Sequence, residues 1–209
     1  MFLFLLIGLM GFLYSFSSIK NGIKKVGTPI VEFMDGENQF LTHNMVNKLL
    51  IQNKIGVKNQ AKTVIDLYKL ENNIIKNPYV AKASVFLTID GTLKVTIKQR
   101  EPVARIIDNS LSYYVDKEGV KVPLSANYSA RVILVSGIKK DKDIIEIKPL
   151  ISYILNDEFL KKEVVGIEKS EEKEYKISVR SGDYKIDFGK LINVDFKFCQ
   201  WPHNLVTIT

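Results

Sequence analysis

The sequence has little of what disulfide-stabilised and metal-dependent proteins rely on. It contains one cysteine, Cys199, so no disulfide forms within the chain, and it contains two histidines, His43 and His203. The two histidines lie far apart in the sequence. A Cys199/His203 pair alone does not complete a closed zinc site, which needs about four ligands. We therefore predict no metal site and no cofactor.

Sequence motifs that mark common enzyme classes are also missing. The chain has no G-x-S-x-G, no H-E-x-x-H and no glycine-rich phosphate loop. Hydrolysis of glycan strands needs two placed carboxylates in a cleft, and the acidic residues are so scattered that no pair can be nominated. We predict no catalytic residue and no small-molecule substrate, and we expect that the protein is not an enzyme.

The composition is that of an ordinary globular protein with a basic surface. Of 209 residues, 46% are hydrophobic and 25% charged, which leaves room for one or two small domains. The net charge of +7 comes from lysines spread along the chain. Nucleic-acid binding needs clustered basic residues with interleaved aromatic rings, and no such stripe is present, so no nucleic-acid partner is predicted.

Charged side chains are absent from residues 1–19, MFLFLLIGLMGFLYSFSSI. As a helix this stretch would be about 28 Å long, close to the hydrocarbon thickness of a membrane. We interpret it as a single transmembrane anchor. A cleaved signal peptide is a second interpretation, although no basic residue precedes the apolar run and no A-x-A site follows it. A buried core helix is a third, although an all-round apolar helix has no polar face for solvent.

Residues 26–100 predict a small α+β domain in the order β-α-α-β-β. A strand begins at Ile30, and Thr42 is placed to cap a helix over residues 43–52. After a polar loop, apolar residues at helical spacing end at Asn77-Pro78, where the period changes to two. Two alternating strands then flank an Asp90-Gly91 turn. Two helices on one face of a three-stranded sheet would satisfy this pattern.

Residues 101–198 predict a second, β-rich domain with one or two helices. Strands are expected over 103–107, 112–115, 120–124, 132–135, 164–168, 174–180, 184–188 and 192–198. Asp116-Lys117-Glu118-Gly119 is interpreted as a turn, with a carboxylate site on Asp116 and Glu118 as the alternative. The charged run Lys139–Asp143 is expected to be a solvated loop. Pro149 is expected in the first turn of the helix that follows.

Four segments carry a resemblance to a known family when they are taken in order. LYKLENNIIKNPYVAKASVF, TLKVTIKQREPVARI, SYYVDKEGVKVPL and ARVILVSG resemble the bacterial cell-division family FtsQ/DivIB, in the form found in Bacteroidetes. The β-α-α-β-β unit resembles a POTRA domain. The resemblance implies a non-enzymatic, single-pass inner-membrane protein whose POTRA and β domains lie in the periplasm at the division septum.

The resemblance also implies partners and a mode of action. Members link early and late division components and regulate septal peptidoglycan synthesis through FtsB and FtsL. The periplasmic location disagrees with the charges that follow the apolar stretch, Lys20, Lys24 and Lys25. Basic residues beside a membrane span favour the cytoplasmic side, so on charge alone the rest of the chain would lie in the cytoplasm. Residues 199–209 depart from the family pattern, and we expect them to form an atypical tail.

Binding by such a protein is expected at an exposed sheet edge, where a partner strand can pair with free backbone groups. The resemblance places docking on the last strands of the β domain. The candidate partner-binding residues there are Tyr175, Ile177, Tyr184, Ile186, Phe188, Phe196 and Phe198. A second surface is expected around residues 31–34 and the first helix of the POTRA-like unit.

Two other functions fit parts of the sequence. An accessory of outer-membrane protein assembly or secretion would also contain POTRA units, although such proteins usually carry several units or a following barrel. An envelope enzyme acting on peptidoglycan would need the carboxylate pair that the sequence does not mark.

Overall fold

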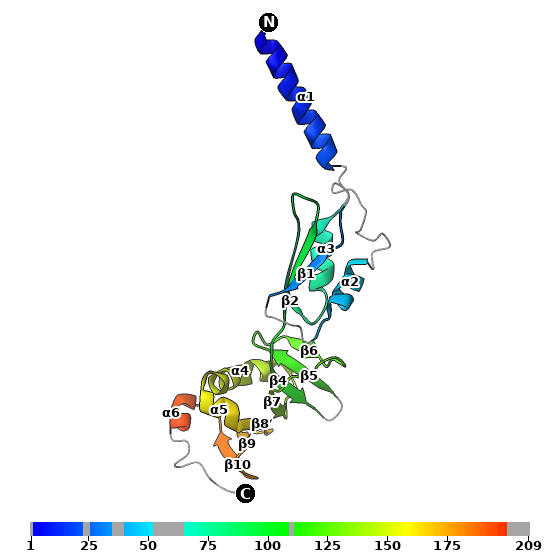
Figure 1. Cartoon of the computed structure of the whole chain (residues 1–209). Helices are drawn as coiled ribbons and strands as arrows, with labels where there is room; N and C mark the ends of the chain where they lie inside the picture. The colour runs from blue at the N-terminus through cyan, green and yellow to red at the C-terminus, as the bar shows by residue number, and fades with distance from the viewer. Residues whose placement is uncertain (1, 23–25, 35–39, 52–64, 109–110, 200–209) are drawn as a thin grey trace. The chain divides into compact units, whose positions relative to one another are not determined.

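The computed structural model describes residues 2–22, 26–34, 40–51, 65–108 and 111–199 (Figure 1). The chain divides into two compact units, Met1–Gln99 and Arg100–Thr209. The expected polar loop over residues 53–63 and residues 200–209 of the tail lie outside the described residues.

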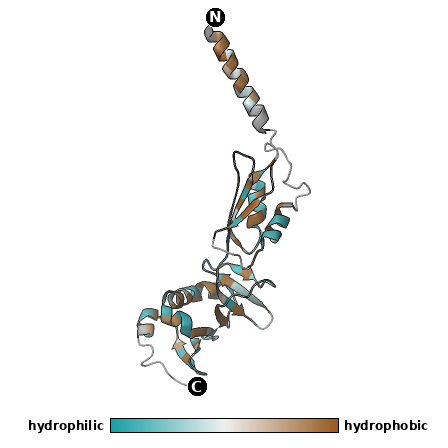
Figure 2. Cartoon of the chain, in the orientation of Figure 1, coloured by the Kyte–Doolittle hydropathy of each residue, from teal (hydrophilic) through white to brown (hydrophobic). Residues whose placement is uncertain are grey.

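One helix, α1 (Phe2–Gly22), covers the uncharged N-terminal stretch. Its described residues are mostly apolar (Figure 2). Their large apolar side chains are exposed, with Phe4 and Tyr14 each at 79%. Within the described part of the chain, however, no helix combines the length and the apolarity that crossing a membrane requires. The predicted membrane-spanning anchor over residues 1–19 is therefore not confirmed.

The rest of the first unit has the β-α-α-β-β order that the sequence predicts. Its elements are β1 (Ile30–Phe33), α2 (His43–Ile51), α3 (Leu67–Ile75), β2 (Val80–Leu87) and β3 (Leu93–Gln99). The strand order is β1-β3-β2, with β1 parallel and β2 antiparallel to β3. The two helices contact each other, α3 lies against β2, and α2 contacts β1.

Local side-chain chemistry starts both helices of this unit. The Thr42 hydroxyl accepts a hydrogen bond from the backbone N–H of Met45 at 3.3 Å, as predicted for an N-cap. The Asp66 carboxylate accepts one from the backbone N–H of Lys69 at 2.9 Å before α3. The predicted hairpin turn contains Gly91 with φ of 99°, where glycine avoids the strain of a side chain.

The period-two pattern correctly predicts the buried face of this sheet. Leu93, Val95 and Ile97 on β3 are 0% exposed, while Lys94 and Thr96 between them are half-buried. They form one core cluster with Leu70 and Ile74 of α3. This confirms the predicted helical face and the predicted strand face together.

The second unit is a mixed seven-stranded sheet with helices. Its elements are β4 (Pro102–Ile107), β5 (Ser112–Asp116), β6 (Lys121–Pro123), β7 (Ile133–Ser136), α4 (Asp141–Asn156), α5 (Glu158–Glu163), β8 (Val164–Lys169), β9 (Tyr175–Val179), β10 (Lys185–Gly189) and α6 (Val194–Cys199). The strand order is β10-β9-β8-β7-β4-β5-β6. Strands β4, β7 and β8 are parallel, and the outer pairs are antiparallel.

Helices α4 and α5 form the connection between the parallel strands β7 and β8, which need a crossover to pair side by side. The apolar face of α4 packs into one cluster with the sheet, and Ile147, Leu150 and Ile154 are 0% exposed. The element order therefore gives a mixed α+β fold with a β-rich second unit, as predicted.

The predicted start of the long helix is wrong. We expected a loop over Lys139–Asp143 and Pro149 in the first turn, but α4 begins at Asp141 and Pro149 lies inside it. The charged run folds because the Asp143 carboxylate accepts hydrogen bonds from the backbone N–H groups of Lys139 and Lys140 at 3.0 and 2.9 Å. These bonds satisfy amides that a helix start otherwise leaves unpaired.

The strand predicted over residues 192–198 is also wrong, because this segment contains the helix α6. Asn193 adopts φ of 53°, a left-handed conformation that interrupts an extended chain. Phe198 then packs against Tyr153 and Phe188, with ring centroids 4.8 and 5.1 Å apart. The described part of this unit consequently holds three helices rather than the expected one or two.

Candidate partner-binding edge

Strand β10 is one edge of the seven-stranded sheet, and it pairs there with β9 alone. Its residues alternate, with Ile186 and Phe188 buried and Lys185 and Asp187 exposed. The pairing with β9 shifts register between Asp187 and Gly189, which marks a bulge. An edge strand of this kind offers backbone N–H and C=O groups to an added strand.

The structure places the seven predicted binding residues on three neighbouring elements. Tyr175 and Ile177 lie on β9, Ile186 and Phe188 on β10, Tyr184 just before β10, and Phe196 and Phe198 on α6. Five of them are core residues with an exposed fraction of 6% or less: Tyr175, Ile177, Ile186, Phe188 and Phe198. Their side chains hold the edge in place and are not free to touch a partner.

Two of the predicted residues do have accessible side chains. Phe196 is 63% exposed on α6, and Tyr184 is half-buried before β10. The exposed face of β10 carries Lys185 and Asp187, which sequence reasoning did not nominate. The signal for them was present, because residues between buried positions of an edge strand must face solvent.

Lys197 is a further residue that sequence reasoning missed. From α6, its ammonium group donates hydrogen bonds to the backbone oxygens of Phe188 and Lys190, each at 2.7 Å. It also lies 4.8 Å from the centre of the Phe188 ring. Helix α6 therefore satisfies backbone acceptors at the end of β10, so the accessible edge is the part before Phe188.

The opposite edge of the sheet is protected against pairing. Strand β6 has three residues, Lys121–Pro123, of which Lys121 and Pro123 are exposed. Short length, lysine and proline are devices by which proteins prevent edge-to-edge association, since proline has no N–H to donate. Strand β10, with five residues and no proline, lacks two of these devices.

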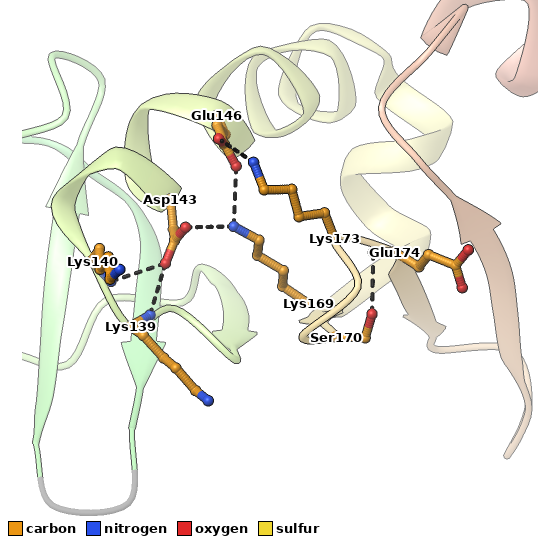
Figure 3. A network of polar contacts seen from close by, with 8 residues as sticks. All are labelled: Lys139, Lys140, Asp143, Glu146, Lys169, Ser170, Lys173 and Glu174. Atoms are coloured by element: carbon orange, nitrogen blue, oxygen red, sulfur yellow. Dashed lines mark hydrogen bonds and ion pairs between the residues drawn. The ribbon is translucent and has the colours of Figure 1, made fainter.

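A network of charged side chains joins the end of β8 to the start of α4 (Figure 3). The Lys169 ammonium group is buried and contacts Asp143 at 2.5 Å and Glu146 at 3.1 Å. Lys173 reaches the other oxygen of Glu146 at 3.2 Å. The Ser170 hydroxyl accepts a hydrogen bond from the backbone N–H of Glu174 at 3.1 Å.

Three members of the network, Asp143, Glu146 and Lys169, have a pKa shifted in the direction that favours the charged form. Burial raises the pKa of Asp143, but hydrogen bonds from Lys169 and from backbone amides outweigh it and leave the pKa below its usual value. Hydrogen bonds from Lys169 and Lys173 lower the pKa of Glu146. Burial lowers the pKa of Lys169, but its bonds to Asp143 and Glu146 raise it overall. Groups that stay charged near neutral pH are poorly suited to proton transfer. We interpret the network as structural, because its contacts join the start of α4 to the end of β8 and so stabilise the β7–α4–β8 crossover.

Asp116 serves the turn between β5 and β6. One carboxylate oxygen accepts hydrogen bonds from the backbone N–H groups of Glu118 and Val120 at 2.9 and 2.8 Å. The other contacts Arg100 at 2.6 Å. The turn interpretation of this segment is confirmed, because the Asp116 carboxylate is engaged by these partners.

Metal binding finds no support in the described residues. There, no three or more His, Cys, Asp and Glu side chains are grouped as metal binding would need. Of the Cys199/His203 pair, the Cys199 side chain and the whole of His203 lie outside what the structure describes.

Comparisons with known proteins match both units. The model of a family described as FtsQ/DivIB, C-terminal related matches residues 101–203, and that of the POTRA-like domain matches residues 31–98. No protein with a curated description matches the chain.

Among solved structures, the chain is similar to the major extracytoplasmic domain of the trans isomer of the cell-division protein DivIB from Geobacillus stearothermophilus. The two are 14% identical with a TM-score of 0.38, over 49% of this chain and 88% of that one. A similarity of this size carries no argument about function.

Proposed function

Because the chain belongs to the FtsQ/DivIB family, we propose that it is a non-enzymatic bacterial cell-division protein that acts by binding other proteins. In this proposal it links early and late division components and regulates septal peptidoglycan synthesis. Its partners are small membrane proteins of the FtsB and FtsL kind. The family match over the second unit carries the proposal.

The proposed docking mode is addition of a partner strand to β10. The exposed side chains of Lys185 and Asp187, of opposite charge, would select the partner, and Phe196 and Tyr184 would supply apolar contacts beside the strand. The buried aromatic residues of the sheet would hold the edge rigid, which lowers the entropy lost on binding.

A cross-linking experiment tests this docking mode. A photoreactive amino acid at Lys185 or Asp187 should form covalent adducts with FtsB- or FtsL-like proteins in the living cell. The same amino acid at Lys142, exposed on α4, is the control. Adducts of equal yield at Lys142, or their absence at both edge positions, would contradict docking at β10.

We also propose that residues 1–19 anchor the protein in the inner membrane, with the bulk of the chain in the periplasm. The uncharged sequence and the exposed apolar side chains of α1 support this. Membranes washed with alkaline carbonate should retain the full chain and lose a version that starts at residue 26. Protease added to spheroplasts should digest the second unit, and protection of that unit would reverse the proposed topology.

Septal function is tested by depletion and localisation. Loss of the protein should give filamentous or chained cells, and a fluorescent fusion should gather at midcell. Uniform envelope fluorescence together with normal septation would count decisively against a role in division.

A further inference from the structure

A groove lies where the three parallel strands of the second unit begin. Strands β4, β7 and β8 start at Pro102, Ile133 and Val164, and parallel pairing brings these starts to one end of the sheet. The groove there has a volume of about 690 Å³, within the range of ligand sites. We call it the strand-start groove, and it shares no residue with β10.

The charge of the strand-start groove is strongly one-sided. Four cationic side chains line it, Lys117, Arg131, Lys161 and Arg180, against the single carboxylate of Glu101. Glu101 is already paired with Lys117 at 2.6 Å. Among the described residues, no ion pair is formed by the other three cations, although the charge of Arg180 helps to lower the pKa of nearby Glu163.

A smaller apolar cavity adjoins the strand-start groove. It measures about 220 Å³ and lies between α4 and strands β4 and β5, with Ile106, Ile144, Ile147 and Ile151 in its walls. Four residues line both spaces: Val103, Lys117, Leu155 and Asn156. A molecule lying in the groove therefore has an apolar recess beside it that can take one bulky side chain.

The chemistry of the two spaces selects among anionic ligands. Sugar chains are commonly held by stacking on aromatic rings, and neither lining contains one. A bare phosphate would use the cations but leave the apolar recess empty. A peptide with carboxylates and one apolar anchor uses both, and buried anchors of this kind contribute much of the energy at protein interfaces.

We propose that the strand-start groove binds an acidic peptide segment of a partner protein, with one large apolar side chain inserted into the adjoining cavity. This is a second binding surface, and it does not depend on docking at β10. Carboxylates of the segment would pair with Arg131, Lys161 and Arg180, and the anchor would lie against Val103 and Leu155.

The test uses the full chain in detergent and three fluorescein-labelled peptides. The first has the sequence Glu-Glu-Gly-Phe-Gly-Glu-Glu, the second carries serine in place of phenylalanine, and the third carries lysine in place of every glutamate. The first should bind with a Kd below about 1 mM, the second about tenfold more weakly, and the third should not bind. Added salt should weaken binding of the first.

Paired variants locate the site. Reversing two groove cations, Arg131→Glu with Lys161→Glu, should weaken binding of the first peptide by about tenfold or more. The control variant makes the same change of net charge at two exposed positions outside the groove, Lys142→Glu with Lys176→Glu. It should change the Kd by less than about twofold. Ser152→Trp, at the exposed mouth of the cavity, should reduce the advantage of phenylalanine over serine, whereas Ile145→Trp on α4 should not.

Several results would overturn the proposal. The proposal is wrong if the first peptide does not bind, or if the phenylalanine and serine peptides bind with the same Kd. It is also wrong if the groove variant and its charge-matched control weaken peptide binding equally. Loss of binding to isolated peptidoglycan or to anionic lipid vesicles in the groove variant, with its peptide affinity unchanged, would likewise contradict it. Because β10 is intact in every variant, failure here leaves the cross-linking test of β10 unaffected.

Discussion

Lys169 shows how a single residue can hold a crossover connection in place. Its side chain is 5% exposed, so the charge would be costly there without partners. Asp143 also caps the start of α4 through two backbone amides, so one carboxylate joins the helix start to the end of β8. Removing the lysine leaves Asp143, itself 16% exposed, without its cation.

Lys169→Met should therefore destabilise the second unit strongly. Breaking one side of a buried ion pair costs about 3 kcal/mol, because the remaining charge loses its compensation. Lys139→Met is the matched control, since Lys139 pairs with Glu171 on the surface and both side chains are exposed. Urea unfolding should show a large loss for Lys169→Met and no measurable change for Lys139→Met; equal effects would contradict a structural role for the network.

The same network predicts how stability depends on pH. Asp143 and Glu146 have a pKa below their usual values of 3.8 and 4.5, so their stabilisation is present above those values and is lost as pH falls through the lowered pKa. Lys169 has a pKa above its usual 10.5, so its stabilisation is present below 10.5 and is lost as pH rises through the raised pKa.

The free energy of unfolding should thus be flat between about pH 5 and pH 10 as far as this network contributes, and should fall at both ends. Urea midpoints measured across pH would show this, and Lys169→Met should reduce both slopes. A variant whose slopes match those of the natural chain would show that other groups determine the pH dependence.

At the residue scale, the sequence predicts which side chains are buried where apolar and polar residues alternate regularly. It does not predict contacts between residues that are far apart in the sequence. Leu93, Val95 and Ile97 are recognisable as buried because they alternate with polar residues. The contact of Lys169 with Asp143 joins residues 26 positions apart. No local pattern marks such a pair, and the charged run that contains Asp143 resembles a solvated loop.

At the scale of elements, α6 is the clearest disagreement between sequence and structure. Ile192, Val194, Phe196 and Phe198 alternate with polar residues, which is the pattern of a strand. A six-residue segment is too short for periodicity alone to separate helix from strand. Contacts made by Phe198 and Lys197 with the end of β10 determine the outcome, and those contacts are tertiary.

Helix α6 offers a matched pair of substitutions. Phe198→Ala should destabilise the second unit by about 3 kcal/mol, because it removes a ring that is 6% exposed and packed on two others. Phe196→Ala should change stability by less than about 0.5 kcal/mol, since Phe196 is 63% exposed. Thermal unfolding would measure both.

If Phe196 contacts a partner beside β10, its alanine variant should also lower the yield of cross-links from Lys185 without loss of stability. A stable Phe196→Ala protein with normal cross-linking would restrict docking to the strand itself.

At the scale of the whole molecule, the described residues form two separate hydrophobic cores. One cluster is formed around β3 and α3 and the other around α4 and the seven-stranded sheet. The two family matches meet in the same region, ending at residue 98 and beginning at residue 101. Each unit therefore has the hydrophobic core that an independent domain requires.

The segments 26–100 and 101–198, produced separately, should each fold alone. Each should unfold in one cooperative transition, because small domains with their own core usually behave as two-state systems. Amide hydrogen exchange would check the result: protected amides in β3 and in β8 should match those of the full chain.

The second segment omits Arg100, which contacts Asp116 at 2.6 Å. A version that starts at residue 100 is therefore the matched comparison and should be the more stable of the two. If neither version folds without the first unit, the division into two domains at residue 100 is wrong, and the docking proposals for the second unit would have to be tested on the full chain alone.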